Sequence, residues 1–335
     1  MSTTVSQHRS DATLSPTTTA EHAPHTTLIL LAFAAVYVIW GSTYLAIRVG
    51  VESFPPLLVA GLRHLVFGAL FYPFLRWKTG IRPTLQHWRT AAVTGFLLLF
   101  LGNGGVCVAE QTVPSGLTAL LVATVSLWMV LVDWLRPGGT RPVPRVFIGL
   151  LLGFAGVALL VGPKSLGGSD RVSPVGVTIL VVASLAWSCG SLYSKHGALP
   201  ASPLMGAAMQ GLCGGVVLWI VAFLTGEIRG LHLAAVSTRS WVAIAYLVFF
   251  GSMMGFTAYV YILKKSTATR VATYALVNPV VALLLGWLLA GEAITLRTIL
   301  ATTVILAAVL LVISAPHRKA ALEASTPAAP EVAKA

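Results

Sequence analysis

The chain has 335 residues, of which 56% are hydrophobic and only 10% are charged. A soluble domain carries about a quarter charged residues, so most of this surface cannot face water. The net charge of +12 sits in short clusters between hydrophobic runs, a distribution that membrane topology produces and that argues against a nucleic-acid partner. The three cysteines lie far apart in apolar stretches, which argues against a disulfide framework or a metal site.

The two ends of the sequence differ in composition from the region between them. Residues 1–27 are rich in Ser, Thr, Ala and His and lack apolar periodicity, which predicts a disordered tail. Residues 315–335, rich in Ala, Pro, Lys and Glu, predict a second short tail. No short apolar signal region with a small-residue cleavage site precedes the first apolar run, so we expect that run to remain as an uncleaved span.

Between the tails, ten apolar segments are long enough to cross the hydrocarbon core as helices, which takes about 17–25 residues. Transmembrane strands would be shorter and would alternate polar with apolar residues, which these segments do not. We therefore predict an all-α integral membrane protein with ten transmembrane helices. Only Arg63 and Asp133 among the residues in these segments are Lys, Arg, Asp or Glu. The segments are 28–47, 57–75, 90–109, 116–135, 146–162, 174–194, 204–224, 241–263, 271–290 and 298–314.

The positive charges are unequally divided between alternate connections. Of the 22 Lys and Arg residues, 15 fall in the connections and tails of one side and 6 in those of the other, with Arg63 remaining. Cytoplasmic loops carry the excess of Lys and Arg. Both termini are therefore predicted to be cytoplasmic, and the connection at 51–55 is predicted to face outward.

The sequence also repeats itself. Shifts of 147 and then 153 positions align similar residues in two halves, 28–162 and 174–314, with five segments each. The pairs include Trp40 with Trp187, Gly50 with Gly197, Arg63 with Gln210, and Gly102 with Gly255. Because five is odd, the second half enters the membrane from the opposite side. Such inverted repeats are typical of secondary transporters, whose substrate site lies near the midplane between the halves; a duplication retained only for folding is the alternative.

Arg63 is the one basic residue inside an apolar segment. It lies six residues into the second segment, about 9 Å from its outer edge, where a charge is costly and marks a functional or paired site. Its expected partner is a substrate carboxylate or phosphate, or Glu110 at the end of the third segment. A structural clamp on backbone carbonyls, or snorkelling to the interface, is the alternative. Gln210, its repeat partner, also forms hydrogen bonds, so both residues are predicted to line the central space.

Further polar and aromatic residues lie inside the segments. Asn278 precedes Pro279, which is expected to interrupt the ninth segment and free a carbonyl, and Ser126 is the polar residue at the equivalent position. Asn103 lies in a glycine-rich stretch that predicts a close helix crossing or a pivot. Aromatic residues could form cavity walls, although ordinary packing is the alternative. The predicted substrate-binding set is Arg63, Gln210, Asn278, Ser126, Asn103, Trp40 and Tyr274.

Three other ionisable residues are given local interpretations. His64 is interpreted as packed and neutral, with a proton relay as the alternative. Asp133 stands one turn before Arg136, which favours a local ion pair. Glu292, in the loop before the last segment, is interpreted as a capping or loop-fixing residue.

Several signatures are absent from the sequence. There is no phosphate-binding Gly-x-x-x-x-Gly-Lys-Ser/Thr loop, which argues against ATP as the driving force. No metal-ligand cluster and no Ser–His–acid set is present, so neither a cofactor nor a catalytic residue is predicted. No segment carries a deep carboxylate, so a simple glutamate-based proton exchanger is not predicted either.

The motifs resemble the EamA-type family of the drug/metabolite transporter superfamily over essentially residues 28–314. The opening run Ile39-Trp40-Gly41-Ser42-Thr43-Tyr44, with Arg48, Pro55-Pro56 and Arg63, is similar to the family's first two spans. The runs Ala109-Glu110-Gln111 and Val113-Pro114-Ser115-Gly116 are similar to the YedA-like permease subgroup, and Asn278-Pro279 and Gly291-Glu292 to the ninth span and its loop. Two positions depart from the pattern: Ser126 replaces a usual proline, and Gly138–Gly139 replaces a common Gly–Glu pair.

The resemblance implies a ten-helix inner-membrane permease that works by alternating access, commonly an exporter of amino acids, metabolites or drugs. We therefore predict a secondary transporter, not an enzyme, whose partners are a small-molecule substrate and membrane lipids. The sequence leaves open the coupling ion and the oligomeric state. A translocator of a lipid-linked or nucleotide-linked substrate and a passive channel are the alternatives.

Overall fold

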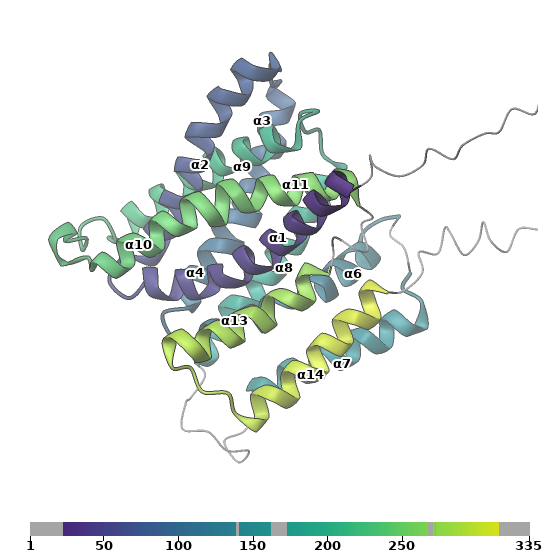
Figure 1. Ribbon diagram of the computed structural model, residues 1–335. Coiled ribbons are helices and arrows are strands. Elements are labelled where there is room, and N and C mark those ends of the chain that lie inside the picture. The colour runs from purple at the N-terminus through teal and green to yellow at the C-terminus, as the bar shows by residue number, and fades with distance from the viewer. Residues whose placement is uncertain (1–22, 139–140, 162–172, 267–270, 272, 315–335) are drawn as a thin grey trace, which may run out of the picture.

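The computed structural model describes residues 23–138, 141–161, 173–266, 271 and 273–314, and every regular element within them is a helix (Figure 1). The all-α prediction is therefore confirmed. Most of the predicted tails, 1–27 and 315–335, lies outside the described residues. Residues 23–27 already belong to α1 (Ala23–Gly50), so this helix begins before the predicted start. Pro24 stands in its first turn, where proline is well tolerated.

Eight helical segments are long and apolar enough to cross a membrane, and two further apolar helices are shorter. Each of the ten predicted ranges overlaps one of them, and eight rather than ten have the length of a membrane span. The eight are α1, α2 (Pro56–Thr79), α3–η1–α4 (Leu85–Ala109), α5–α6 (Ser115–Leu135), α8 (Pro174–His196), α9 (Pro203–Leu224), α10–η4–α11 (Thr238–Lys265) and α14 (Leu296–Ile313). The two shorter helices are α7 (Pro144–Val161) and α13 (Tyr274–Ala290).

Two of the segments contain π-helical turns. The third segment consists of α3 (Leu85–Thr94), η1 (Gly95–Gly104) and α4 (Gly105–Ala109). The other consists of α10 (Thr238–Tyr246), η4 (Leu247–Met254) and α11 (Gly255–Lys265). π-Helical turns are rare and are found frequently at functional sites, and no pattern in the sequence predicted them.

The glycine-rich stretch at η1 is a close helix crossing. A Cβ added at Gly102 would lie 2.8 Å from the ring of Trp187 on α8, and one added at Gly104 would lie 2.9 Å from Leu218 on α9. Any larger side chain would push these helices apart. The structure thus confirms the predicted crossing.

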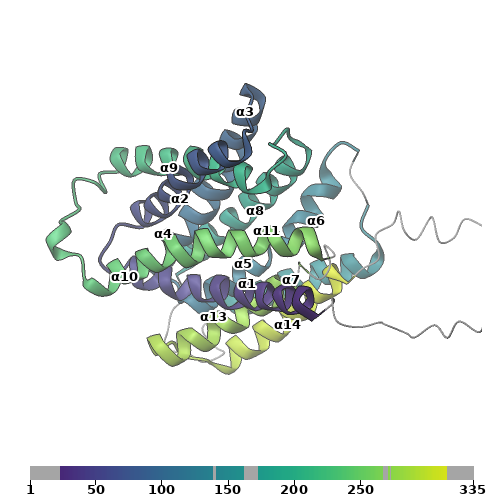
Figure 2. The same cartoon turned by 45° about the horizontal axis from the view of Figure 1, so that its top comes forward.

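The helices form one bundle in which neighbours come from both halves of the chain (Figures 1 and 2). α2 lies along α9, while α7 and α14 pair along one edge, away from them. α1 packs on α13 and on α10–η4–α11, and α8 packs on η1, α4 and α6. The largest apolar core joins α1, α2, α4, α5, α8, α9 and α14.

We call the two ends of the bundle the Pro55 end and the Gly80 end, after a loop residue at each. The Pro55 end carries loops 51–55, 110–114, 225–237 and 291–295, which meet around two cavities. The Gly80 end carries the loops 80–84 and 197–202 and the described part of the loop between α6 (Val125–Leu135) and α7. At this end Gly80 closes α2 with a φ of 65°, the left-handed conformation that glycine adopts without strain.

Candidate substrate site

Arg63 lies on α2 and is 5% exposed. Its Nε donates a 2.8 Å hydrogen bond to Oγ of Ser252, a fully buried residue of η4. The two ion pairs found among the described residues, Arg136–Asp133 and Arg239–Glu52, do not include it. Arginine does not lose its charge in proteins, so a buried cation stands here with a neutral partner.

Glu110, the proposed intramolecular partner of Arg63, is not bonded to it. Both carboxyl oxygens of Glu110 are buried without a hydrogen-bond partner in the described part of the chain. A substrate anion stays the predicted partner of Arg63. The arginine does not clamp backbone carbonyls either, since its one hydrogen bond among the described residues goes to a hydroxyl.

His64, next to Arg63, connects α2 to the other π-helical turn. Its Nε2 lies 3.1 Å from Oδ1 of Asn103 in η1, and its side chain is buried. Consecutive residues of α2 therefore bond to both π-helices, Arg63 to η4 and His64 to η1. The bond of His64 to an amide favours the interpretation as a packed residue.

Trp40 and Tyr274 extend the site from η4 to α13. Trp40 donates through Nε1 to the carbonyl oxygen of Gly251, 3.2 Å away and one residue before Ser252. Its ring lies 5.4 Å from the ring of Tyr274 and 5.0 Å from the ring of Tyr259. These edge-to-face and tilted contacts make a continuous aromatic wall beside the arginine.

The side-chain amide of Asn278 contacts the backbone of two aromatic residues, Tyr274 and Tyr37. With its amide oriented by its neighbours, the nitrogen faces the carbonyl oxygens of Tyr274 and Tyr37 at 3.2 and 3.3 Å. The predicted interruption at Pro279 is wrong, because α13 continues without a break from Tyr274 to Ala290. Proline removes one backbone donor but leaves the helix intact when neighbouring groups satisfy the freed carbonyls.

Two predicted residues lie apart from this group. Gln210, on α9, is half-buried. Its backbone carbonyl oxygen faces Gly95 at the start of η1, and a Cβ added at Gly95 would lie 2.7 Å from that oxygen. No hydrogen bond joins it to Arg63 within the described residues. Ser126 donates to the carbonyl oxygen of Ala123 in its own span, a local bond that bends or fixes the helix.

The local predictions for the acidic residues are confirmed. Arg136 donates to Asp133 at 2.6 Å, one turn away. Glu292 accepts from the backbone N–H of Ser115 at 2.7 Å, from its hydroxyl at 2.8 Å, and from the N–H of Gly116 at 3.0 Å. A carboxylate at the start of α5 (Ser115–Ala123) satisfies orphan donors and the helix dipole.

A second glutamate, which sequence reasoning missed, does the same for α2. Glu227 accepts from the backbone N–H groups of Leu57 at 3.1 Å and Leu58 at 3.2 Å. Partial burial raises the pKa of Glu227, while these two hydrogen bonds act to lower it. The sequence gives little indication of this cap, because Glu227 and the start of α2 are 170 residues apart in the chain.

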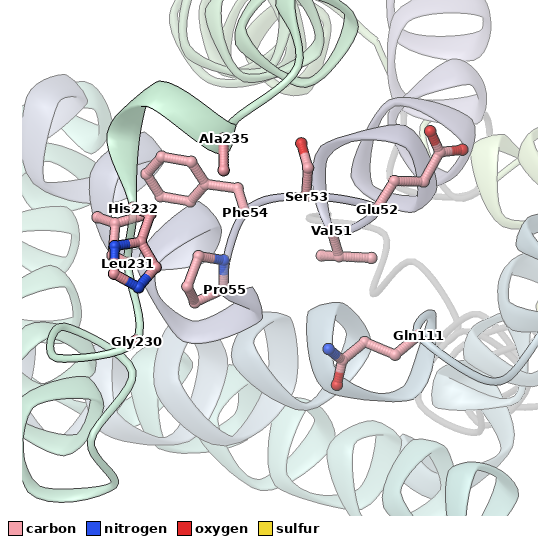
Figure 3. A pocket seen from close by; sticks show the side chains of 10 residues that line it. All are labelled: Val51, Glu52, Ser53, Phe54, Pro55, Gln111, Gly230, Leu231, His232 and Ala235. Carbon is pink, nitrogen blue, oxygen red and sulfur yellow. The ribbon is translucent and has the colours of Figure 1, made fainter.

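Two cavities lie at the Pro55 end, and Arg63 lines neither of them. One has a volume of about 290 Å³ and is lined by loop 51–55, Gln111 and residues 230–232 and 235. Figure 3 shows Val51 and Gln111 on facing walls, with His232 and Leu231 on the side opposite Glu52. The other, of about 240 Å³, is lined by Arg48, Glu52, Pro114, Arg239 and residues 289, 290 and 292.

A bundle of apolar helices, eight of them long enough to span a bilayer, with a buried arginine inside it, defines an integral membrane protein. Residues 26–162 and 174–314 match the EamA-like transporter family. The chain belongs to this family, whose members are transporters and not enzymes, and the predicted resemblance is confirmed.

The relatives carry transporter names. The uncharacterized inner membrane transporter YedA of Escherichia coli K12 is 41% identical over 84% of this chain and 89% of its own length. A protein named probable amino-acid metabolite efflux pump, from the same organism, is 27% identical over 78% of this chain and 86% of its own. A crystal structure 20% identical in sequence covers 86% of this chain and 98% of its own with a TM-score of 0.59, which shows a shared fold.

Proposed function

We propose that this protein is a secondary transporter that moves a small metabolite, amino acid or drug across the inner membrane by alternating access, and that it works as an exporter. The observation that carries the proposal is Arg63, a buried cation whose Nε binds Ser252 on η4. An anionic group of a substrate would compensate the buried charge. The name of the amino-acid efflux relative supports a substrate with a carboxylate.

The site lies, in this proposal, between two inverted five-helix repeats, 28–162 and 174–314, with ten crossings in all. Contacts exchanged between the halves support this arrangement. Trp187 of α8 packs at Gly102 in η1, and its repeat partner Trp40 of α1 packs at Gly255 after η4. The separate family matches of residues 26–162 and 174–314 support the same division.

The substrate set comprises Arg63, Asn278, Asn103, Trp40 and Tyr274, together with Gln210 and Ser126. Arg63 lies beside η4 of the second half, and its repeat partner Gln210 lies beside η1 of the first half. Repeat-related polar groups at two π-helical turns suit a site that both conformations share. Gln210 and Ser126 would reach the substrate only in a conformation that separates the halves.

The Pro55 end is proposed to face outward and both termini to lie in the cytoplasm. The excess of Lys and Arg in the connections of the Gly80 end and in the tails supports this orientation. An inner-membrane location follows the name of the relative YedA.

The experiment that tests this function has two stages. Purified protein is first screened by thermal shift against amino acids, organic anions, nucleotide-linked compounds and cationic drugs, because a ligand of the folded state raises its melting temperature by mass action. The hit is then assayed for counterflow in liposomes. A carrier shows uptake stimulated by substrate on the opposite side; uptake without that stimulation would mean a passive channel.

The same screen separates the runner-up. A lipid-linked or nucleotide-linked substrate would also place a phosphate on Arg63, since guanidinium groups bind phosphate with two parallel hydrogen bonds. Stabilisation by nucleotide-linked compounds alone would replace the small-metabolite proposal with this one. Stabilisation by hydrophobic cations alone would remove Arg63 from the site.

A further inference from the structure

Among the described residues, Glu110, at the end of α4, is the acidic residue whose carboxyl group has no partner. It is 0% exposed, and neither carboxyl oxygen has a hydrogen-bond partner among the described residues. Its backbone carbonyl, not its carboxyl group, accepts from Nη1 of Arg48. The other two buried or half-buried glutamates of the Pro55 end, Glu227 and Glu292, each cap a helix.

The charged and titratable groups around Glu110 come from several elements. They are Tyr44 and Arg48 on α1, Cys107 on α4 and Glu292 after α13, while Arg63 and Glu227 act on Cys107 one turn away. The facing turns of η1 and α8, which also pack on α4, carry no titratable side chain near it. The guanidinium of Arg48 is therefore close to Glu110, but it donates to the backbone carbonyl of Glu110 and not to the carboxyl group.

An ionised carboxylate in this position would be very unfavourable. Burying an unpaired charge costs far more than burying a neutral polar group, and such groups take up a proton instead. Burial raises the pKa of Glu110 well above its usual range, the nearby charge of Glu292 raises it further, and Arg48 lowers it. Burial without a hydrogen-bond partner therefore favours the neutral, protonated form of this carboxyl group.

Two cavities border residues close to Glu110 in the chain, whereas its own side chain is fully buried. Gln111, the next residue, lines the cavity of Figure 3, and Pro114 and Arg48 line the other cavity. Cavities of about 290 and 240 Å³ each hold several waters, since one water occupies about 30 Å³. A small separation of loop 110–114 from α1 would hydrate the carboxyl group.

We propose that Glu110 is a proton-binding site that controls the opening of the Pro55 end: it keeps its proton while that end is packed around it and releases it into water when the end opens. On opening, the carboxyl O–H bond breaks and the proton passes to water, leaving a hydrated carboxylate. On closing, the carboxylate takes a proton back from the same water, so that the carboxyl O–H bond forms again. The role of this opening in transport rests on the proposed function, whereas the binding of the proton does not.

The proposal fixes the sign of the pH dependence. The closed end holds the proton more tightly than the open, hydrated end, whose carboxyl has an ordinary pKa of about 4.3. Between the ordinary pKa and the raised one, the open state binds fewer protons, so rising pH favours opening. Each pH unit in that window shifts the ratio of open to closed molecules by up to about tenfold.

Cys107 provides a reporter for this opening. It lies one turn before Glu110 on α4 and is 1% exposed. In a chain with Cys189→Ala and Cys213→Ala, labelling of Cys107 by a water-soluble maleimide measures how often water reaches this turn. Because the thiolate is the reactive form, labelling rises with pH in any variant. The rate is therefore divided, at each pH, by that of Glu110→Gln, which cannot release a proton.

The expected result is a ratio that increases with pH above the ordinary carboxyl pKa, by up to about tenfold per unit, and then levels off. Glu52→Gln, a matched substitution of an exposed acid at the same end, should show the wild-type profile. Glu110→Leu replaces the carboxyl group by an apolar side chain of similar size. Its labelling rate, divided by that of Glu110→Gln, should not change with pH. A ratio that does not change with pH would overturn the proposal.

The outcome separates the two proposals. A pH-dependent ratio without counterflow of any screened compound would leave the proton site standing and remove the transporter function. Counterflow with the same pH dependence in Glu110→Gln as in the wild type would keep the transporter function and show that the proton of Glu110 does not control it.

Discussion

The two ends of the bundle satisfy the starts of their helices in different ways. At the Pro55 end, α2 and α5 begin on Glu227 and Glu292, which come from the second half of the chain. At the Gly80 end, α9 begins on its own Ser202. α2 and α9 are repeat partners, and position 80, equivalent to Glu227, is a glycine. Two similar helices therefore start on a long-range carboxylate at one end and on a local hydroxyl at the other.

This difference shows how an approximately symmetric bundle favours one state. The carboxylates bond second-half loops to first-half helices, so they hold the halves together at the Pro55 end. Ser202 holds only its own helix, and at the Gly80 end the halves meet through the apolar packing of Leu75 and Ala91 on Met205 and Met209. The asymmetry predicts that the closed Pro55 end is the more stable one, and substitutions at these caps measure it.

Glu292→Ala is expected to have the largest effect. It removes three hydrogen bonds from Ser115 and Gly116 and leaves donors at the start of α5 without partners. The free energy of unfolding should fall by about 2–4 kcal/mol, because hydrogen bonds to charged groups and caps contribute about 1–3 kcal/mol each. Thermal denaturation in detergent measures it. A melting temperature equal to that of wild type would contradict the cap.

Glu227→Ala should have a smaller effect in the same direction. Its carboxylate makes two bonds of 3.1 and 3.2 Å to Leu57 and Leu58 and is only partly buried. A loss of about 1–2 kcal/mol is expected, the range of a single helix cap. Glu227→Gln, which keeps one acceptor oxygen, is the control and should lose less. If alanine and glutamine had equal effects, the hydrogen bonds would not be the cause.

Ser202→Ala, at the Gly80 end, should have the smallest effect. Its hydroxyl accepts from the N–H of Met205 at 3.4 Å, a long bond, so the expected loss is about 0.5 kcal/mol, the low end for a helix cap. It should also leave Cys107 labelling unchanged, whereas Glu227→Ala and Glu292→Ala should raise it. A rise with Ser202→Ala would mean that the two ends are not independent.

Much of the fold could be predicted from the sequence because it depends on local pattern. The apolar segments, the cap by Glu292 and the ion pair of Asp133 follow from residues that are near one another or from a known motif. The close crossing at Gly102 followed from glycine content alone. Arg63 was identified as a single charge in an apolar run, which requires no knowledge of its neighbours.

The remaining features depend on which helices meet. Ser252 is an ordinary serine in the sequence and becomes the partner of Arg63 only because η4 packs on α2. Glu110 stands one residue beyond a predicted span and was not regarded as a deep carboxylate, but the loops of the Pro55 end cover it completely. The π-helical turns follow from packing between the halves, which one sequence does not reveal.

The central claim is that Arg63 binds the transported molecule, and the most direct test is counterflow by Arg63→Ala. The account predicts that transport falls by about 10–100-fold, the equivalent of one hydrogen bond to a charged group, with the melting temperature of the ligand-free protein largely retained. The matched control, Arg229→Ala, removes an exposed arginine and should transport normally. Wild-type counterflow by Arg63→Ala would contradict the claim and leave the arginine as a structural link between α2 and η4.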